Sequence, residues 1–240
     1  FSDIPNNRIV KWQEGPEGPS ISTFRTPSGR SNGLTIDKQG RLLACEHLGR
    51  RVSITQTDGT VETLVDAYGG KRLNSPNDIV VRSDGIVYFT DPPYGLIASA
   101  PSNPLDDNIP SELGFNGLFR VLTDGSIELL ADNFLRPNGL AFSPDERVLY
   151  VDDTHARHIR VFDVDDDGRL MNDRVFFTYL GVTDDNGPDG MKVDVGGNLW
   201  VTGPGSTWIV SREGDALGRI RPPEHPANVA FGGADWKTLF

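Results

Sequence analysis

The sequence predicts an all-β fold of the β-propeller class, and two observations support this prediction. Apolar residues alternate at a spacing of two along most of the chain, between groups of Gly, Asn, Asp and Pro, as is typical of strands, and helix signals are scarce. In addition, one phrase recurs: an Asn or Asp in a turn, an alternating apolar run, a turn rich in Gly and Asp, and a second strand. The copies are Ser31-Asn32-Gly33-Leu34, Ser75-Pro76-Asn77-Asp78, Arg136-Pro137-Asn138-Gly139, Gly187-Pro188-Asp189-Gly190 and Pro226-Ala227-Asn228-Val229.

The distance between these copies identifies the kind of repeat. Their Asn or Asp residues are about 45, 61, 51 and 39 residues apart, close to the period at which four-stranded propeller blades recur. A propeller places the first strand of each blade against the central channel. We therefore expect the residues that open these strands to converge near the axis at one end: Asn32, Asn77, Asn138, Asp189 and Asn228.

Taken in order, the chain is predicted to hold six blade positions, the first and last of them incomplete. Phe1 to Trp12 is typical of the later strands of a blade whose first strand would precede residue 1. The next blade has strands near residues 34–37, 41–46, 51–55 and 61–65. The blade that starts at Asn77 is interrupted by a long excursion from Pro92 to Gly114, which favours a binding loop. Further blades start at Asn138, at Asp189 and at Asn228, where only the beginning of a blade is present.

Composition limits the classes of function. The 240 residues are predicted to form a single domain, 1–240, because no low-complexity linker or charge block divides them. A formal charge of −11 argues against a nucleic-acid or anionic-membrane surface and is compatible with cation binding. No apolar run approaches the roughly 18 residues of a membrane span. Cys45 is the only cysteine, so no intramolecular disulfide can form. The predicted partner is a small molecule and the predicted state a monomer or weak homo-oligomer, while the cellular location stays open.

The residues at the predicted axis indicate a metal site. Several Asn side-chain oxygens and one carboxylate that meet at one place form a hard-oxygen site, and Ca²⁺ accepts six to eight such ligands. Zn²⁺, Mn²⁺ and Mg²⁺ are the alternatives. For any single copy, a simple turn is favoured roughly four to one, because Asn-Gly and Asp-Gly are ordinary turn formers. The predicted convergence is what favours a site.

The same motifs carry a family resemblance that extends over nearly the whole chain. The chain resembles the SMP-30/gluconolactonase/LRE-like family, and within it the bacterial gluconolactonases. This resemblance implies a six-bladed β-propeller with one catalytic divalent metal, usually Ca²⁺, in the channel, and hydrolysis of sugar lactones. The motifs that carry it are Ser75-Pro76-Asn77-Asp78, Thr90-Asp91-Pro92-Pro93-Tyr94-Gly95, Glu112-Leu113-Gly114-Phe115-Asn116-Gly117, Arg136-Pro137-Asn138-Gly139-Leu140 and Pro188-Asp189-Gly190.

The resemblance also assigns metal ligands. The family uses one Glu, two Asn and one Asp, and the last three match Asn77, Asn138 and Asp189. The Glu has no counterpart here and would lie before residue 1. A second departure is Ser75, which stands where some sugar-lactone hydrolases of the family carry a substrate-binding Arg.

These parts define a predicted mechanism for opening a lactone such as glucono-1,5-lactone to the aldonic acid. The metal polarises the lactone carbonyl, water attacks it, and Asp189 is the candidate catalytic base. Four further residues are candidates for contacts with substrate hydroxyls, with a structural role open for each: Asn32, Asp91, Tyr94 and Glu112.

Other functions remain open on the same fold. One is metal-dependent hydrolysis of organophosphates or phosphoesters, and another is a non-enzymatic binding propeller. The segment Asp163-Val164-Asp165-Asp166-Asp167-Gly168 is similar to the start of an EF-hand loop, but its twelfth position is Arg174 instead of Glu, so we predict an acidic hairpin. A serine nucleophile of the strand–turn–helix elbow kind is not predicted, because helix signals are scarce.

Overall fold

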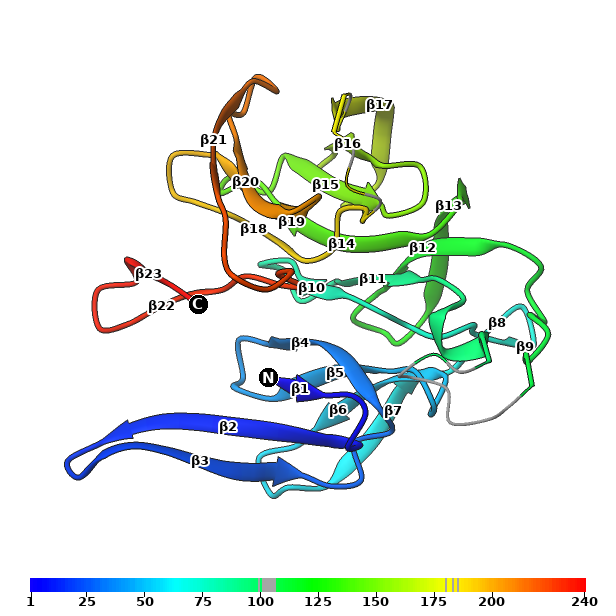
Figure 1. Cartoon of the computed structure of the whole chain (residues 1–240). Helices are drawn as coiled ribbons and strands as arrows, with labels where there is room; N and C mark the ends of the chain where they lie inside the picture. Colours follow the sequence, from blue (N-terminus) through cyan, green and yellow to red (C-terminus); the bar gives the residue numbers. More distant parts are fainter. Residues whose placement is uncertain (99, 101–106, 180, 183, 185) are drawn as a thin grey trace. The chain divides into compact units, whose positions relative to one another are not determined.

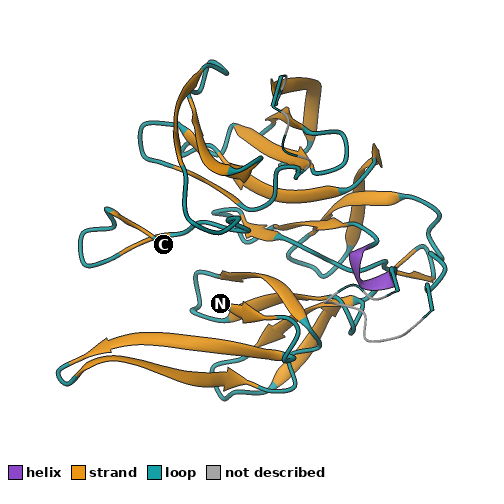
Figure 2. Ribbon diagram, viewed as in Figure 1, coloured by secondary structure: helices purple, strands orange, loops and turns teal. Residues whose placement is uncertain are grey.

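A computed structural model of the chain describes residues 1–98, 100, 107–179, 181, 182, 184 and 186–240. These residues form two compact units, Phe1–Asn133 and Phe134–Phe240. Both units consist of antiparallel strands and connecting loops (Figure 1). The one helix in the described residues is a single 3-10 turn, Tyr94–Leu96 (Figure 2). The all-β prediction is confirmed.

The first unit contains three sheets whose strands pair in sequence order, and one small hairpin. The first sheet has three strands, and the other two have four strands each. Their strands are β1 (Ser2–Asp3), β2 (Arg8–Gly15) and β3 (Gly18–Arg25); β4 (Ser31–Ile36), β5 (Leu42–Glu46), β6 (Arg51–Thr55) and β7 (Val61–Val65); and β10 (Ile79–Val81), β11 (Val87–Asp91), β12 (Asn116–Val121) and β13 (Ile127–Phe134). The hairpin is β8 (Ala67–Tyr68) with β9 (Lys71–Arg72).

The second unit repeats the pattern with two four-stranded sheets and one two-stranded pair. The strands are β14 (Pro137–Phe142), β15 (Val148–Asp153), β16 (His158–Val164) and β17 (Leu170–Thr178); β18 (Met191–Val193), β19 (Leu199–Gly203), β20 (Ser206–Val210) and β21 (Ala216–Ile220); and β22 (Phe231–Gly232) with β23 (Thr238–Leu239). Within this unit β18 lies beside β14, and within the first unit β4 lies beside both β1 and β10. The first strands of successive four-stranded sheets, β4 with β10 and β14 with β18, are therefore neighbours within each unit, as the propeller class requires.

In the four-stranded sheets the second and third strands are mostly buried, whereas the fourth strands are mostly half-buried or exposed. All of β11 is buried, whereas seven of the eight residues of the outermost strand β3 are exposed. The core of the first unit centres on the stacked rings of Phe89 and Phe119, 5.4 Å apart between centroids. The core of the second unit includes Met191 and Ile159, both fully buried. Each sheet contributes its alternating apolar residues to these cores, which is why the spacing of two was visible in the sequence.

The same loop conformation recurs in three of the sheets and shows which of their strands correspond. Asn7, Arg50 and Arg157 have φ of 54°, 51° and 57°, a left-handed conformation that is uncommon outside glycine. Arg50 and Arg157 lie between the second and third strands of their sheets, and Asn7 lies between β1 and β2. Strands β1 to β3 therefore correspond to the second, third and fourth strands of the complete sheets. This correspondence agrees with the predicted incomplete first blade.

Five of the six predicted blade positions are described as sheets of three or four strands. Four sheets have four strands and one has three, so five blade-like sheets are described, and β22 and β23 form only a two-stranded pair. The predicted turn at the acidic segment is confirmed: residues 165–169 form the hairpin turn between β16 and β17, and Arg174 pairs with Asp163 at 2.9 Å. Part of the predicted excursion, residues 99 and 101–106, lies outside the described residues.

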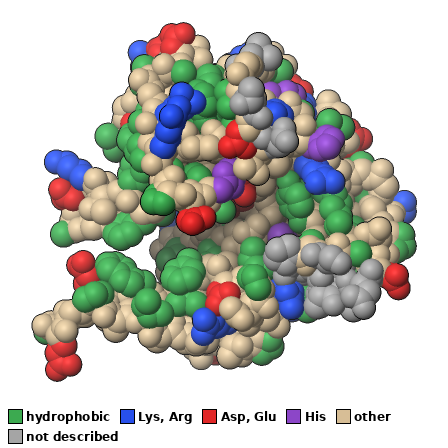
Figure 3. Space-filling model, in the orientation of Figure 1, with side chains coloured by type: hydrophobic (Ala, Val, Ile, Leu, Met, Phe, Trp, Pro, Cys, Tyr) green, Lys and Arg blue, Asp and Glu red, His purple; other side chains and the backbone are tan. Residues whose placement is uncertain are grey.

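Hydrophobic side chains gather on one face near β1, β2 and β4 (Figure 3). Phe1, Trp12, Phe24 and Ile36 line one pocket and are between 43 and 66% exposed. The described residues include no helix with the length and apolar character that crossing a membrane requires.

Candidate functional site

In the first unit the predicted residues Asn32 and Asn77 lie in direct contact. Asn32 Nδ2 donates a hydrogen bond to Asn77 Oδ1 at 2.5 Å, and His47 Nε2 lies 3.0 Å from the same oxygen. Asn77 is buried, and Asn32 is half-buried. Asn77 Oδ1 is therefore the hydrogen-bond acceptor that Asn32 and His47 share. The predicted convergence is confirmed for this pair.

His47 is neutral at physiological pH. Burial lowers the pKa of its imidazole to about 4, although the hydrogen bond with Asn77 opposes the shift. A neutral imidazole carries one N–H, and with Nε2 as the donor to Asn77 the other nitrogen, Nδ1, is an acceptor. Nδ1 is buried and has no hydrogen-bond partner among the described residues. The sequence analysis did not assign His47 to the site.

The glycines after the repeated Asn allow neighbouring strands to approach closely. A Cβ on Gly33 would lie 2.5 Å from the carbonyl oxygen of Asn77, and Gly33 N donates to that oxygen at 2.6 Å. In the second unit, a Cβ on Gly139 would lie 2.1 Å from the carbonyl oxygen of Asp189. Neither glycine is among those with positive φ. Asn32 and Asn138 also lie inside β4 and β14, so the predicted turn at these Asn-Gly pairs is wrong, and the glycine is required for close packing.

Asp91, a predicted substrate contact, is fully buried at the end of β11. Its Oδ2 accepts the backbone N–H of Asn74 at 2.7 Å, and its Oδ1 accepts that of Ser75 at 2.8 Å. Burial raises the pKa of Asp91 to about 7, while these backbone hydrogen bonds oppose the rise. Asp153 accepts the N–H groups of Leu135 and Arg136 in the same way at the end of β15. The repetition indicates that both carboxylates fasten the segment that precedes a first strand.

Ser75 belongs to the same fastening. Its hydroxyl donates to the carbonyl oxygen of Pro92 at 2.5 Å and accepts the N–H of Gly95 at 2.8 Å. Ser75 is fully buried, and a Cβ on Gly95 would lie 2.7 Å from its Cβ. A long arginine side chain would not fit at this position without movement of residues 92–95.

The two other predicted substrate contacts flank the excursion. Tyr94 is half-buried and opens the 3-10 turn. Glu112 is exposed and accepts hydrogen bonds from Arg50 Nη1 at 3.2 Å and from the backbone N–H of Arg72 at 3.1 Å. The hydrogen bond from Arg72 N–H and the charge of Arg50 lower the pKa of Glu112. Glu112 therefore stays ionised and holds the returning end of the excursion against Arg50 and Arg72.

In the second unit Asn138 is buried in β14, and Asp189 is half-buried just before β18. Asn138 Nδ2 donates to Thr154 Oγ1 at 3.0 Å. Asp189 N donates to the carbonyl oxygen of Thr202 at 3.1 Å, which ties the segment before β18 to β19. Because Gly139 contacts the backbone of Asp189, two predicted metal ligands lie on adjoining segments of this unit. Asn228 packs against Gly190 in the next repeat position, where it is exposed.

The donor set of the predicted ligands fits a hard divalent cation. In the described residues, no three His, Cys, Asp or Glu side chains gather closely enough to bind a metal. The predicted set of Asn77, Asn138 and Asp189 is of another kind, with two amides and one carboxylate. The contacts above orient both amides, and amide and carboxylate oxygens are ligands that Ca²⁺ prefers.

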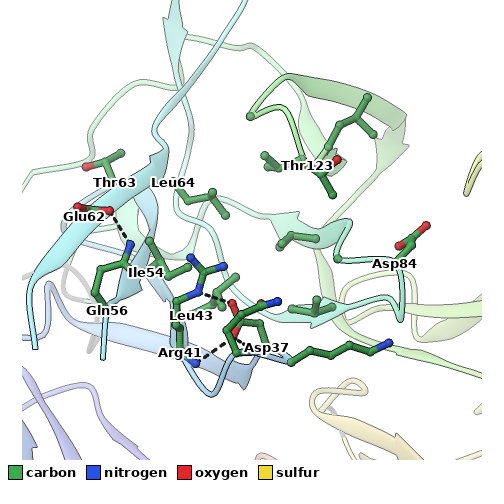
Figure 4. Close-up of a pocket in the computed structure, with 18 of the residues that line it drawn as sticks. Asp37, Arg41, Leu43, Ile54, Gln56, Glu62, Thr63, Leu64, Asp84 and Thr123 are labelled. Atoms are coloured by element: carbon green, nitrogen blue, oxygen red, sulfur yellow. Dashed lines mark hydrogen bonds and ion pairs between the residues drawn. The ribbon is translucent and has the colours of Figure 1, made fainter. Parts of the chain in front are cut away.

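The first unit contains a pocket of about 560 Å³ (Figure 4), whose lining does not include Asn32 or Asn77. Its wall includes the ion pair of Asp37 with Arg41, 2.7 Å apart, together with Asp84 and Thr123. These residues follow the ends of β4, β10 and β12, whereas Asn32 lies near the start of β4 and Asn77 precedes β10. The pocket is therefore at the opposite end of these strands from the two asparagines.

Comparison with known proteins shows matches along the whole chain. The family described as SMP-30/Gluconolactonase/LRE-like region matches residues 1–240. A gluconolactonase of Zymomonas mobilis is 35% identical over 262 residues, which cover 100% of this chain and 71% of that protein. A pentonolactonase of Haloferax volcanii is 30% identical, with 99% and 74% covered. The diisopropyl-fluorophosphatase of Loligo vulgaris is 29% identical, with 87% and 67% covered.

Solved structures with the same fold are similar over the whole chain. The structure of a gluconolactonase from Xanthomonas campestris has a TM-score of 0.88 and 37% identity, covering 100% of this chain and 76% of that one. A calcium-binding protein, regucalcin from Agrobacterium tumefaciens, has a TM-score of 0.77 at 18% identity, with 99% and 75% covered. The second likeness concerns the fold alone.

Proposed function

Because the chain belongs to the SMP-30/gluconolactonase/LRE-like family, we infer that it is a lactone hydrolase. We propose more specifically that it opens sugar lactones such as glucono-1,5-lactone to aldonic acids in a calcium-dependent reaction, on a single propeller of six blades. The gluconolactonase and pentonolactonase relatives support the substrate class. The observation that carries the proposal is that both matching Asn side chains, Asn77 and Asn138, are buried with their amides oriented by polar neighbours.

The proposed ligands of the divalent cation are Asn77, Asn138 and Asp189. Ca²⁺ is favoured over Zn²⁺ because all three residues would ligate through hard oxygen atoms and not through imidazole nitrogen or sulfur. It is favoured over Mg²⁺ because Ca²⁺ accepts six to eight oxygen ligands, neutral amide oxygens included, whereas Mg²⁺ retains several waters. Mn²⁺ also suits oxygen ligands and stays the alternative. When bound, such a cation polarises a carbonyl group and stabilises negative charge on its oxygen. Hydrogen bonds from Asn32 and His47 hold Asn77, and the hydrogen bond to Thr154 holds Asn138.

The carboxylate of Asp189 is proposed as the general base. It accepts a proton from the water that attacks the lactone carbonyl carbon, and the bond between that carbon and the ring oxygen then breaks. The ring oxygen takes up a proton and becomes the hydroxyl of the aldonic acid. A lactone is an activated ester, so a carboxylate is a sufficiently strong base. Asn32, Asp91, Tyr94 and Glu112 remain proposed substrate contacts, although both oxygens of Asp91 are engaged by backbone N–H groups.

The direct test is hydrolysis of glucono-1,5-lactone, followed by proton release, on chelator-treated protein with and without added Ca²⁺. We expect hydrolysis to require the cation and to return with Ca²⁺. Parallel additions of Zn²⁺, Mn²⁺ and Mg²⁺ identify the preferred ion. Folded, Ca²⁺-supplied protein that leaves both gluconolactone and pentonolactones at the uncatalysed rate would refute the proposal.

A second candidate function is favoured by the diisopropyl-fluorophosphatase relative. The same carboxylate and oxygen ligands would act on a phosphorus ester. Turnover of diisopropyl fluorophosphate measured beside the lactones separates the two activities, and we expect the lactone to have the higher kcat/KM. The third candidate is a binding protein without catalysis. Lactone turnover that is lost when Asp189 is substituted would exclude it, because a binding protein has no turnover that depends on this residue.

A further inference from the structure

The hydroxyl of Thr154, just after β15, contacts two segments that carry proposed cation ligands. Its Oγ1 accepts a hydrogen bond from Asn138 Nδ2 at 3.0 Å and donates one to the carbonyl oxygen of Pro188 at 2.8 Å. Pro188 immediately precedes Asp189. One side chain therefore joins the Asn ligand of this unit to the segment that presents the Asp ligand.

The direction of these hydrogen bonds follows from chemistry. The carbonyl oxygen of Pro188 can only accept, so the single hydrogen atom of the Thr154 hydroxyl is directed to it. The hydroxyl oxygen can then only accept, so Asn138 must present its NH₂ group. An Asn amide alone can exchange its oxygen and nitrogen ends by rotating about its last side-chain bond. Here Thr154 selects one of the two orientations and leaves Oδ1 as the end directed away from the hydroxyl.

The backbone contacts of Thr154 are equally close. Its N–H donates to the carbonyl oxygen of Arg136 at 3.0 Å, two residues before Asn138. A Cβ on Gly187 would lie 2.0 Å from the carbonyl oxygen of Thr154, so the segment 187–188 packs directly on this residue. Thr154 itself is thus held firmly enough to orient its partners.

We propose that Thr154 is a positioning residue for cation binding: its hydroxyl fixes Oδ1 of Asn138 as the ligating end and fixes the carbonyl that precedes Asp189. This inference rests on the proposed function, in which Asn138 and Asp189 bind a divalent cation. Without the hydroxyl, the amide can rotate and present its NH₂ group, which cannot ligate a cation. The repeat places His47 and Thr154 at the same position, immediately after the acidic residue that ends the second strand, and both contact a proposed Asn ligand.

The test compares three variants by calorimetric titration of chelator-treated protein with Ca²⁺. Thr154→Val keeps the shape and removes the hydroxyl, Thr154→Ser keeps the hydroxyl, and Thr178→Val makes the same change on the outermost strand of the same sheet. We expect Thr154→Val to raise the Kd for Ca²⁺ about tenfold, equivalent to about 1.4 kcal/mol. Thr154→Ser and Thr178→Val should bind like the parent.

Kinetics give a second readout that a purely structural role would not change. In Thr154→Val, the Ca²⁺ concentration that gives half-maximal lactone hydrolysis should rise by the same factor, while kcat at saturating Ca²⁺ stays near that of the parent. In an Asn138→Asp background the two ligand oxygens are equivalent, so adding Thr154→Val should raise the Kd less than it does in the parent, because only the contact with Pro188 is then lost. If Thr154→Val does not fold, Thr154→Cys replaces it with the same expected direction.

Each other outcome has a defined meaning. A parent-like Kd for Thr154→Val in a protein that binds Ca²⁺ overturns this inference and leaves the proposed function intact. Equal weakening by Thr154→Ser and Thr154→Val shows that the hydroxyl is not responsible, and also overturns it. A folded parent that binds no Ca²⁺ overturns the cation part of the proposed function together with this inference.

Discussion

At the scale of single residues, Asn77 and Asn138 are held from opposite ends of their amides. Two nitrogens, of Asn32 and His47, surround the oxygen of Asn77, whereas one oxygen, of Thr154, holds the nitrogen of Asn138. The contact with Thr154 involves the nitrogen end of Asn138, whereas the contacts with Asn32 and His47 involve the oxygen end of Asn77. We therefore expect the side chain of Asn77 to exchange its hydrogen-bond partners when a cation binds, whereas that of Asn138 keeps its orientation.

Asp189→Asn tests the proposed base. The substitution keeps the size of the side chain but removes its basicity, and general bases contribute typically about 10² to 10⁴ in rate. We expect kcat for lactone hydrolysis to fall within that range while the melting temperature measured in chelator stays near that of the parent, because Asp189 is only half-buried. Asp166→Asn removes an equal charge from the exposed acidic hairpin and should leave kcat unchanged. Full activity of Asp189→Asn would exclude this residue as the base.

His47 predicts a dependence of stability on pH. Burial lowers its pKa to about 4, against about 6.5 in an unfolded chain. Between these values the unfolded chain binds a proton that the folded chain does not, so the stability that His47 contributes is present above pH 6.5 and is lost as the pH falls towards 4. The shift corresponds to at most about 3 kcal/mol. Asp91 acts in the opposite direction, because its pKa is raised to about 7 and its contribution to stability falls as the pH rises from about 4 to 7.

A comparison of the parent with His47→Gln isolates the histidine from Asp91. The substituted glutamine side chain keeps an N–H group but cannot titrate. In urea unfolding with chelator present, the stability difference between parent and variant should move in favour of the variant as the pH falls from 7 to 4. A constant difference for His47→Gln would show that the histidine is not buried in its neutral form.

At the scale of elements, the sequence predicted the strands well and misjudged the residues that open them. The bounds of β6 and β7 agree with the predicted ranges because alternating burial directly controls the residue pattern. Asn-Gly was interpreted as a turn, since the same dipeptide favours turns through positive φ. In the structure Gly33 and Gly139 serve close approach between neighbouring first strands. A sequence pattern cannot separate these two uses of glycine, because the second depends on a strand about 50 residues away.

The contacts that orient the site residues were also beyond the sequence, for a related reason. His47 and Thr154 follow Glu46 and Asp153 at the same repeat position, but Pro92 occupies that position after Asp91. His, Thr and Pro have no chemical property in common, so no sequence motif identifies this position. What they share is a place at the end of a second strand, and the repeated positive φ at Arg50 and Arg157 would have been needed to recognise it.

Gly139→Ala tests the close approach of the first strands. The added methyl group would lie 2.1 Å from the carbonyl oxygen of Asp189 and 2.9 Å from Asp152 Oδ2, so the segment that presents Asp189 must move. We expect a loss of about 1 to 3 kcal/mol in stability and a fall in kcat/KM, measured by urea unfolding and by lactone hydrolysis. Gly218→Ala in β21 meets no atom within 4 Å and should change neither. Parent-like activity of Gly139→Ala would mean that this packing does not position Asp189.

At the scale of the whole molecule, the sequence predicts a single domain, whereas the described residues form two compact units. The boundary between them falls inside a strand: β13 ends at Phe134, the first residue of the second unit. The ring of Phe134 packs 6.3 Å from that of Phe162, and the Arg160 guanidinium lies 4.0 Å above it. Domain boundaries usually fall in flexible linkers, whereas the exposed residues Asp132 and Asn133 at this boundary belong to a paired strand. A blade also cannot bury both of its faces alone.

We therefore predict that the two units unfold together, and that a bound cation stabilises both equally. Asn138 and Asp189 both belong to the second unit, so a cation that they hold stabilises the first unit only if the two units unfold in one transition. Pulse-labelled hydrogen exchange in urea, read by mass spectrometry on peptides from β11 and β15, measures the units separately. At a Ca²⁺ concentration 100 times the Kd, both midpoints should rise to the extent given by about 2.7 kcal/mol. A rise confined to β15, or midpoints that already differ without Ca²⁺, would show that the chain folds as two domains.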